Sequence, residues 1–332
     1  MFHSLDGRHV LVRAPASIAN IGPGFDILAM AIKGLYDEVL VSIKSGSGII
    51  TVTSQGFNVP SGKDNVAYAV ANEFISRYNI KDVDTYIEVR KGIPTSCGLG
   101  SSGATSAAVA YALSKVFSLN LRDDELLDLA SVGEFHVSGS KHYDNVAASL
   151  YGGLTIVEPT TRNVFKYVPT TPINIAVIIP SVVELQGIKK TKYSRSLLPQ
   201  QIGLDTHVRQ TSAIALLIYA LFTNNVELLG KAVSVDYIAE PHRSKIIPYY
   251  SELKDLALQG GALGFNISGA GPAVFTIHRN MDDAKRAASR LAKFLELKGV
   301  KAYAYTTTVS SSGAELLARE LNRAENLDTL FQ

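Results

Sequence analysis

The amino-acid sequence predicts an α+β protein built from two domains. Its 332 residues exceed what one small hydrophobic core ordinarily serves. The first 90 residues are rich in β-branched alternation, and the last third reads strand, glycine turn, strand, helix, strand, as in an α+β sandwich. We therefore expect one domain over residues 1–165, a second over residues 166–325, and a frayed tail over residues 326–332.

The elements of the first domain follow from the spacing of its apolar residues. Alternating β-branched residues predict strands, which we expect at residues 10–14, 38–44, 49–54 and 85–90. Helical spacing and helix-forming residues predict helices, which we expect at residues 65–78, 104–117 and 123–135. Asp64 precedes the first of these helices and is a candidate N-cap.

The second half of the chain is also predicted to contain both strands and helices. The expected strands lie at residues 153–157, 173–179, 264–267, 273–278 and 301–309. The expected helices lie at residues 211–223, 226–237, 247–258 and 281–298. Residues 182–202 are polar and lack periodicity, so we expect a loop of the kind that closes over a site.

Composition excludes several classes of protein. Lys and Arg number 32 and Asp and Glu 30, interleaved along the chain, so no basic stripe stands out for a nucleic acid. A single cysteine excludes an intramolecular disulfide framework and a four-cysteine zinc site. The longest apolar run, at residues 211–222, is shorter than the roughly 20 residues that cross a bilayer, and no secretory signal opens the chain. We expect a cytoplasmic enzyme for a small molecule, with neither nucleic acid nor membrane as partner.

A glycine-rich segment at residues 98–103 is the central motif. It formally matches the dinucleotide fingerprint, but that fingerprint needs a strand directly before the first glycine, and residues 91–97 intervene here. A Walker A lysine and the partner motifs of protein kinases are absent from the sequence. Glycines that free backbone N–H groups ahead of a helix still favour phosphate, whereas a plain turn with a serine N-cap is the alternative. Cys97 has no local His or Asn signature of a nucleophile and fits a tight loop.

Two further glycine turns accompany this motif. Residues 13–26 leave a strand through a Gly-Pro-Gly turn and carry Asn20 and Asp26, and residues 264–272 form a tight turn between strands. Together with the Gly-Glu pair at residues 133–134 and with residues 142–153, these segments resemble the motifs of the GHMP small-molecule kinases, and are most similar to those of the homoserine kinases. The order and separation match across the whole chain. Two departures are small: Ala148 replaces Pro, and Gly103 replaces Ala.

The resemblance implies a fold, cofactors and a reaction. It implies the GHMP two-domain fold, with an N-terminal domain like the second domain of ribosomal protein S5 and a C-terminal ferredoxin-like α/β sandwich. ATP with Mg²⁺ would phosphorylate the side-chain hydroxyl of L-homoserine, a small-molecule step of threonine biosynthesis, and the protein would be a homodimer.

Family positions also imply the residues that bind ATP. Ser102 and Glu134 would hold Mg²⁺, and both count with Asn145 as catalytic. Asn65 and Lys91 match residues that contact adenine, although either could be a plain surface polar group. The phosphate loop would comprise Pro94, Thr95, Ser96, Cys97, Gly98, Leu99, Gly100, Ser101, Ser102 and Gly103.

Homoserine is a zwitterion, so its site needs partners of both signs. The resemblance assigns Asp26 to the ammonium group, and Arg195 and Arg243 to the carboxylate, which a planar guanidinium binds bidentately. The remaining candidates of this subsite are Asn20, His142, Asn145 and Thr191.

Asn145 bears on the mechanism. It lies seven residues before Gly152, where related kinases such as mevalonate kinase carry the Asp that serves as base. An amide accepts no proton near pH 7, so we hypothesise that Asn145 positions the hydroxyl and that no side chain serves as a dedicated base. A loose phosphoryl-transfer transition state makes alignment and charge neutralisation the main contributions.

Two rival interpretations stay open. One is a GHMP kinase for another acceptor, such as shikimate, mevalonate or a sugar. The other is a non-catalytic relative that binds ATP or a metabolite. The two arginines with Asp26 favour an amino acid, and intact Ser102 and Glu134 favour an enzyme.

Overall fold

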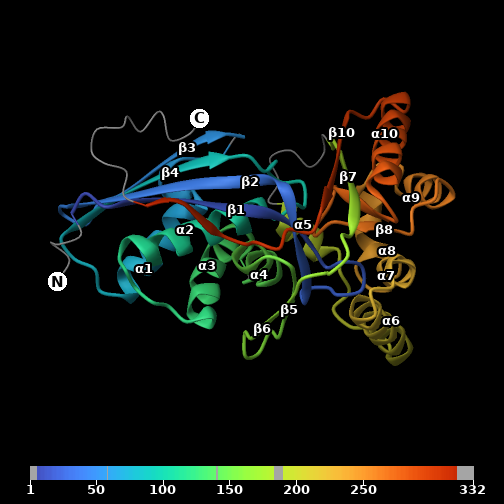
Figure 1. The fold of residues 1–332 in the computed structure, drawn as a ribbon, viewed down its shortest axis with the longest axis horizontal. Coiled ribbons are helices and arrows are strands. Elements are labelled where there is room, and N and C mark those ends of the chain that lie inside the picture. The colour runs from blue at the N-terminus through green and yellow to red at the C-terminus, as the bar shows by residue number, and fades with distance from the viewer. Residues whose placement is uncertain (1–5, 58, 140, 183–189, 320–332) are drawn as a thin grey trace.

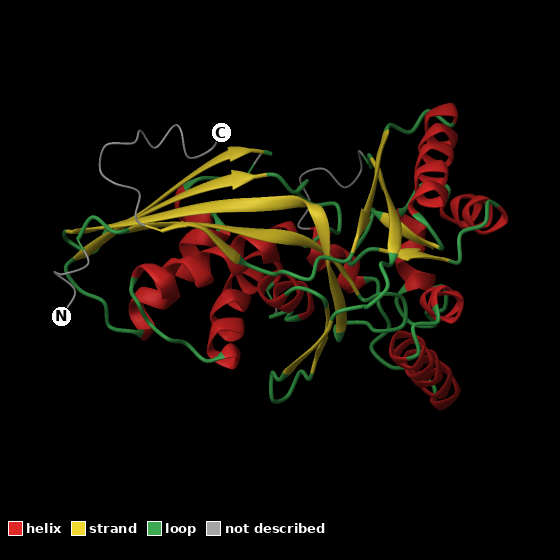
Figure 2. Ribbon diagram, viewed as in Figure 1, coloured by secondary structure: helices red, strands yellow, loops and turns green. Residues whose placement is uncertain are grey.

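In the computed structural model, residues 6–57, 59–139, 141–182 and 190–319 are described. Two β-sheets stand side by side, each covered by helices (Figure 1, Figure 2). The expected tail at residues 326–332 lies outside the described residues. Among the residues described, no helix has the length and apolar character that crossing a membrane would require.

The first sheet has seven strands, in the order β11-β1-β2-β4-β3, with β5 and β6 added beside β2. β3 and β4 pair in parallel, and the other pairs are antiparallel. The strands are β1 (His9–Ala19), β2 (Leu28–Ser45), β3 (Ile50–Gly56), β4 (Val83–Lys91), β5 (Leu154–Val157), β6 (Val164–Tyr167) and β11 (Glu315–Arg319). The helices beside it are α1 (Val66–Arg77), α2 (Ser101–Val116), α3 (Asp123–Ser138) and α4 (Asp144–Tyr151), with a short 3₁₀ turn at Gly62–Asp64.

The second sheet is antiparallel, in the order β10-β7-β9-β8. Its strands are β7 (Asn174–Pro180), β8 (Gly264–Ile267), β9 (Val274–His278) and β10 (Ala302–Thr308). α10 (Met281–Leu297) packs on it. The other helices of this half are α5 (Lys190–Ser196), α6 (Leu204–Phe222), α7 (Val226–Val233), α8 (Glu240–Arg243) and α9 (Tyr250–Gln259), with a 3₁₀ turn at Ser244–Ile246.

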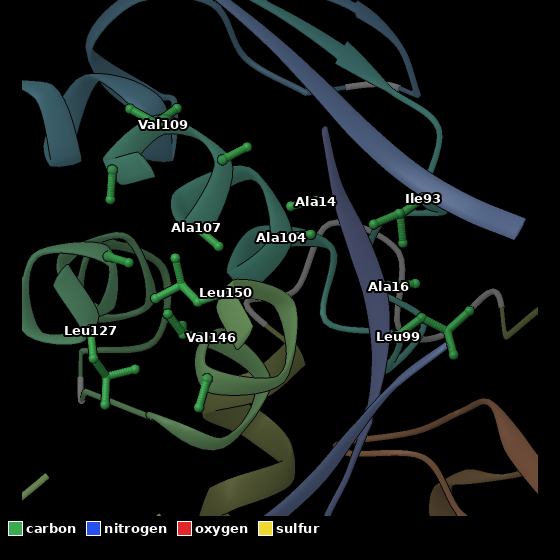
Figure 3. Packing of buried hydrophobic residues seen from close by; sticks show 14 of the residues in the cluster. Ala14, Ala16, Ile93, Leu99, Ala104, Ala107, Val109, Leu127, Val146 and Leu150 are labelled. Carbon is green, nitrogen blue, oxygen red and sulfur yellow. The ribbon is translucent and has the colours of Figure 1, made fainter. Parts of the chain in front are cut away.

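Helix α2 is the centre of the larger core. It packs on β1 and β2 and also against α1, α3 and α4. Small residues such as Ala104 and Ala107, both fully buried, let these elements approach closely, as Figure 3 shows beside Val146 and Leu150 of α4. This packing fixes the N-terminus of α2, which follows the glycine-rich segment.

The structure corrects several sequence-based expectations. α1 is capped by Asn65, whose Oδ1 accepts a hydrogen bond from the Ala67 amide at 2.9 Å, and not by Asp64. The segment at residues 182–202, expected to be a loop, contains α5, and the sequence reading also missed α4. The second domain was expected to run to residue 325, but β11 pairs with β1 of the first sheet. The chain therefore returns to its first sheet, a pairing that no local pattern encodes.

Candidate active site

A cavity of about 610 Å³ is lined by all three glycine turns and by helix α5. Every candidate residue of the ATP and acceptor sets lines it except Gly103. A Cβ at residue 103 would meet Cβ of Asn145 at 3.3 Å, so the family's alanine would fit with a small shift. The cavity thus brings together segments that lie far apart in the sequence, such as those of Asn20 and Ala270.

Glycine is required at two positions of the phosphate loop. Gly98 has φ +92°, and a Cβ there would lie 2.2 Å from the carbonyl oxygen of Ser268 in the third turn. Gly100 has φ +65°, and a Cβ there would lie 2.1 Å from Ser17 Oγ in the first turn. A side chain at residue 98 would push the second turn away from the backbone of the third, and one at residue 100 would be strained by the positive φ and would displace the Ser17 hydroxyl.

The N-terminus of α2 is open toward the cavity. Its N-cap is Gly100, in the left-handed conformation, with no side-chain capping hydrogen bond. The alternative of a serine N-cap is therefore wrong: Ser101 Oγ donates instead to the carbonyl of Ile93 at 3.2 Å. Uncapped backbone N–H groups and the helix dipole make this end suited to an anion such as a phosphate.

Ser102 and Glu134 meet beside this helix end. Ser102 Oγ donates a hydrogen bond to Glu134 Oε1 at 2.5 Å, and Glu134 is only 6% exposed. Burial raises the pKa of the Glu134 carboxyl, while the hydrogen bond from Ser102 and the charge of Lys91 lower it. No group of three His, Cys, Asp or Glu side chains able to hold a metal ion occurs in the part of the chain that is described. The two hard oxygens could hold a cation only together with other ligands, such as phosphate oxygens.

Lys91 lines the cavity, and its ammonium group also has a structural task, so an adenine contact by Lys91 stays a prediction. Its ammonium group forms a buried ion pair with Asp37 and donates to the Ser101 carbonyl at 3.0 Å and to Thr105 Oγ1 at 2.7 Å. These three contacts use all three donors of an ammonium group. Burial lowers the pKa of Lys91, and Asp37 opposes this shift. Lys91 therefore ties β4 to the start of α2.

Asn65 also has a structural task. Besides capping α1, its Nδ2 donates to the Pro60 carbonyl at 2.7 Å. Val59, Pro60 and Val66 line the same end of the cavity and give it an apolar character. An adenine contact by Asn65 stays a prediction, while the apolar wall was not expected from the sequence.

Charged side chains of both signs lie close together among the residues predicted to bind the acceptor. Asp26 Oδ2 lies 2.8 Å from Arg195 Nη2, and Asp26 Oδ1 lies 3.7 Å from His142 Nδ1. Arg195 also lies 3.2 Å from His142 Nδ1. Burial lowers the pKa of His142, and the charge of Asp26 opposes this shift while the two arginines, Arg195 and Arg243, add to it.

Arg243 and Asn20 hold the third turn beside this cluster. Arg243 Nη1 donates to the Gly269 carbonyl at 2.9 Å, and Asn20 Nδ2 donates to the same oxygen at 3.1 Å. Asn20 Oδ1 accepts from the Asp26 backbone amide at 3.2 Å, which fixes the backbone at Asp26. Arg243 is 5% exposed, and its buried Nε has no hydrogen-bond partner among the described residues. A buried unpaired donor of this kind fits a carboxylate ligand.

Asn145 lies between the two ends of the cavity. Its Oδ1 accepts a hydrogen bond from Ser17 Oγ at 2.8 Å, and its backbone N–H donates to Asp144 Oδ1 at 2.8 Å. Asp144 is buried, and burial together with the nearby charge of Asp26 raises its pKa to about 7. Ser17 and Asp144 had no assigned role in the sequence reading, although both lie inside its motifs.

Lys190 is the other functional candidate that the sequence reading missed. It lies on α5, one residue before Thr191, and its ammonium group donates to the carbonyls of Ser96, at 2.6 Å, and of Gly271. Cys97 is buried, its Sγ lies 3.0 Å from the Pro94 carbonyl, and burial raises the pKa of the thiol. A protonated, enclosed thiol agrees with a packing role for Cys97.

Comparison with known proteins identifies one family. The model of the GHMP kinases N terminal domain matches residues 65–153, and the model of the GHMP kinases C terminal region matches residues 217–297. A homoserine kinase of Thermoplasma volcanium is 36% identical over 305 residues, 92% of this chain and 96% of that protein. A homoserine kinase of Pyrococcus horikoshii is 37% identical over 306 residues, 92% of this chain and 99% of that protein.

Solved structures agree with these relatives. The crystal structure of homoserine kinase from Cytophaga hutchinsonii has a TM-score of 0.84 at 32% identity and covers 93% of this chain and 97% of that chain. The crystal structure of L. major mevalonate kinase in complex with R-mevalonate has a TM-score of 0.67 at 18% identity, over 93% of this chain and 98% of that chain, and shows a common fold alone.

Proposed function

The chain belongs to the homoserine kinases of the GHMP kinase family, and on that premise we propose how its cavity divides between ATP and L-homoserine. The reaction transfers the γ-phosphoryl group of ATP to the side-chain hydroxyl of L-homoserine, a step of threonine biosynthesis. One observation carries the choice of acceptor: the Asp26–Arg195 ion pair, with Arg243 beside it, shares a cavity with the phosphate loop.

The acceptor would replace an internal ion pair by two external ones. Asp26 and Arg195 neutralise each other at 2.8 Å when nothing lies between them. A zwitterion could insert its ammonium group toward Asp26 and its carboxylate toward Arg195 and the unpaired Nε of Arg243. Mevalonate and sugars bear no ammonium group, so they would leave Asp26 without a partner, which costs binding energy. This exchange of partners favours an amino acid as acceptor.

ATP would occupy the other part of the cavity. The uncapped N-terminus of α2 and the loop at residues 98–100 would bind the phosphates through backbone N–H groups. The apolar wall of Val59, Pro60 and Val66 would pack against the base, next to the Asn65 amide.

Mg²⁺ fits the chemistry of Ser102 and Glu134. Both supply hard oxygen ligands, and a cation beside Glu134 would stabilise the carboxylate form that burial disfavours. When bound, the ion would neutralise charge that develops on the phosphates.

Asn145 would position the acceptor hydroxyl without removing its proton. Because its Oδ1 accepts from Ser17, its Nδ2 donors are left to face the cavity. A donor to the hydroxyl oxygen orients that oxygen for in-line attack but cannot take its proton. The proton would pass to the γ-phosphate or to solvent, in keeping with a loose transition state.

A coupled ADP-release assay tests the acceptor assignment. We expect turnover with L-homoserine and none with shikimate, mevalonate or galactose at equal concentration. Preference for one of the other three would identify a GHMP kinase with another acceptor. No turnover with any of them would support a non-catalytic binding protein.

A second experiment tests the acceptor subsite. Asp26→Asn and Arg195→Ala should each raise the KM for homoserine at least tenfold, with little change in the KM for ATP, because each removes one charge partner. Arg209→Ala is the matched control, since Arg209 forms an exposed ion pair with Asp205 on α6. Equal effects on both KM values would contradict this division of the cavity.

A further inference from the structure

We propose that the turn at residues 268–272 couples nucleotide binding to acceptor binding, with Lys190 as the positioning residue that joins the two. The inference rests on the proposed function, because it assigns one ligand to each side of the turn. It concerns Lys190, which lines the cavity, and Ser194 on the same helix.

Three consecutive carbonyl groups of this turn accept hydrogen bonds from side chains. The Gly269 carbonyl accepts from Arg243 and Asn20 of the acceptor subsite. The Ala270 carbonyl accepts from Ser194 Oγ at 3.1 Å, and the Gly271 carbonyl accepts from Lys190 Nζ. One short backbone segment is therefore bound by the acceptor subsite at one end and by α5 along the rest.

The phosphate loop is bound to the same turn. Ser268 Oγ donates to the Gly98 carbonyl at 2.7 Å, and the Ala273 amide donates to the Cys97 carbonyl at 2.9 Å. Lys190 adds a third link, because its ammonium group donates both to Gly271 of the turn and to Ser96 of the loop. A ligand that orders residues 96–100 therefore also constrains the turn.

Burying the Lys190 amine costs desolvation free energy, which its hydrogen bonds to the Gly271 and Ser96 carbonyls offset. The residue is 5% exposed. Burial lowers the pKa of Lys190 to about 7, and the charge of Arg243 acts in the same direction. A neutral amine still has two N–H donors, so both carbonyls keep their partner in either protonation state. Ordinary packing would be met by an apolar side chain, so a lysine here points to the two carbonyls as its task.

Helix α5 carries the effect to the acceptor. It has seven residues, too few to be stable alone, so its order depends on what it contacts. Lys190 at its start contacts the phosphate loop, and Arg195 near its end contacts Asp26 and His142. A nucleotide that orders the loop lowers the entropic cost of ordering α5, and the acceptor then binds more tightly.

Calorimetric titration of homoserine, with and without a non-hydrolysable ATP analogue, tests this inference. The chain has no tryptophan, so calorimetry is preferable to intrinsic fluorescence. In the wild type we expect the analogue to strengthen homoserine binding by about fivefold or more, the lower end of typical coupling. In Lys190→Met we expect the analogue to change homoserine affinity by a factor of no more than about two. Homoserine should then also lose its effect on the affinity for the analogue, because coupling between two sites is reciprocal.

Two further variants make the result specific. Lys192→Met is the matched control, since Lys192 lies exposed on the same helix, and it should keep the wild-type factor. If Lys190→Met fails to fold by thermal unfolding, Ser194→Ala replaces it, because this change removes only the hydroxyl that binds Ala270, and it should also reduce the factor.

The possible results separate the inference from the proposed function. If folded Lys190→Met shows the same strengthening of homoserine binding by the analogue as the wild type, Lys190 has no coupling role. If the analogue does not change homoserine binding in the wild type, there is no coupling to explain, and the inference is overturned as well. Failure of the active wild type to bind or phosphorylate homoserine overturns the proposed function and this inference with it. Loss of the factor in Lys190→Met and Ser194→Ala, but not in Lys192→Met, supports the inference.

Discussion

The buried ion pair between Lys91 and Asp37 leads to the sharpest prediction on stability. Asp37 is fully buried, and its Oδ1 accepts from the backbone amides of Gly92 and Ile93, each at 3.1 Å. Its Oδ2 accepts from Lys91 and Thr105. Lys91→Met would leave the Asp37 charge buried without its cation and remove two further hydrogen bonds.

The expected loss of folding stability in Lys91→Met follows from the removal of one partner of the ion pair. Removing one partner of a buried pair costs roughly 3–5 kcal/mol, because the remaining charge stays desolvated. For a domain of about 150 residues, each kcal/mol lowers the midpoint of thermal unfolding by roughly 2–4 °C. We expect a decrease on the order of 10 °C, measured by circular dichroism. Lys81→Met, in the exposed turn before β4, is the matched control and should change the midpoint by no more than about 2 °C.

A double variant tests the stability argument further, and a comparison of ATP with GTP tests whether Lys91 contacts the base. Asp37→Asn combined with Lys91→Met removes the stranded charge while an amide oxygen can still accept from Gly92 and Ile93, so it should regain part of the lost stability. The ratio of kcat/KM for ATP to that for GTP should stay unchanged in Lys91→Met if the Lys91 ammonium group keeps its three partners within the chain when the nucleotide binds. A stable Lys91→Met protein with an altered ATP-to-GTP ratio would refute this reasoning and restore Lys91 as an adenine contact.

Three further predictions concern the site itself. Glu134→Gln should lower kcat by orders of magnitude and weaken the dependence on Mg²⁺; a Mg²⁺ titration like that of the wild type would refute the metal assignment. Asn145→Ala should lower kcat far more than it raises the KM for homoserine; a loss of only a few-fold would contradict the positioning role. The pKa of Asp144 is raised to about 7, so its ionised form, which attracts an ammonium group, dominates above that pH. Because Asp144 interacts with Asp26, the proposed partner of the ammonium group, its ionisation adds negative charge to that subsite, and we expect kcat/KM for homoserine to rise with pH through about 7 in the wild type and to lose this inflection in Asp144→Asn.

Local chemistry made the glycine turns predictable from the sequence. Gly98 and Gly100 have positive φ and lie against other backbone or side chains, and such positions accept little other than glycine. The motif therefore marks a tight turn before α2 in the sequence as well as in the structure, and phosphate binding by this turn stays a prediction. Asp26 and Arg195 were singled out by the family resemblance, and only the structure shows that they lie 2.8 Å apart.

Lys91 shows where the sequence reading stopped short. In β4, burial alternates from Val83 to Lys91, so the lysine falls on the buried side of the strand. That alternation was a usable signal for burial. Its partner was not predictable, because Asp37 meets Lys91 only through the register of β2 against β4, which pairs residues 54 apart in the sequence.

Helix α5 was missed for a different reason. The two residues that it buries, Lys190 and Ser194, lie one turn apart and are both polar. Helices are recognised in a sequence by an apolar face, and α5 buries a polar one because it packs on backbone carbonyls of the turn at residues 268–272. The helix is therefore specified by tertiary hydrogen bonds, which a periodicity search does not register.

The first glycine turn is strained, and contacts with both halves of the chain hold it in place. Ile21 is β-branched and has φ +44°, a conformation that costs about 1–3 kcal/mol. Its side chain is 1% exposed within the larger core, and burying it contributes about 1.5–3 kcal/mol, which offsets the strain. The next residue, Gly22, lies against the second domain, where a Cβ would be 2.2 Å from the Val233 carbonyl. The backbone between Asn20 and Asp26, which both line the cavity, is thus held by a core that contains residues of both halves of the chain and by the contact of Gly22 with Val233, so neither half by itself would preserve the acceptor subsite.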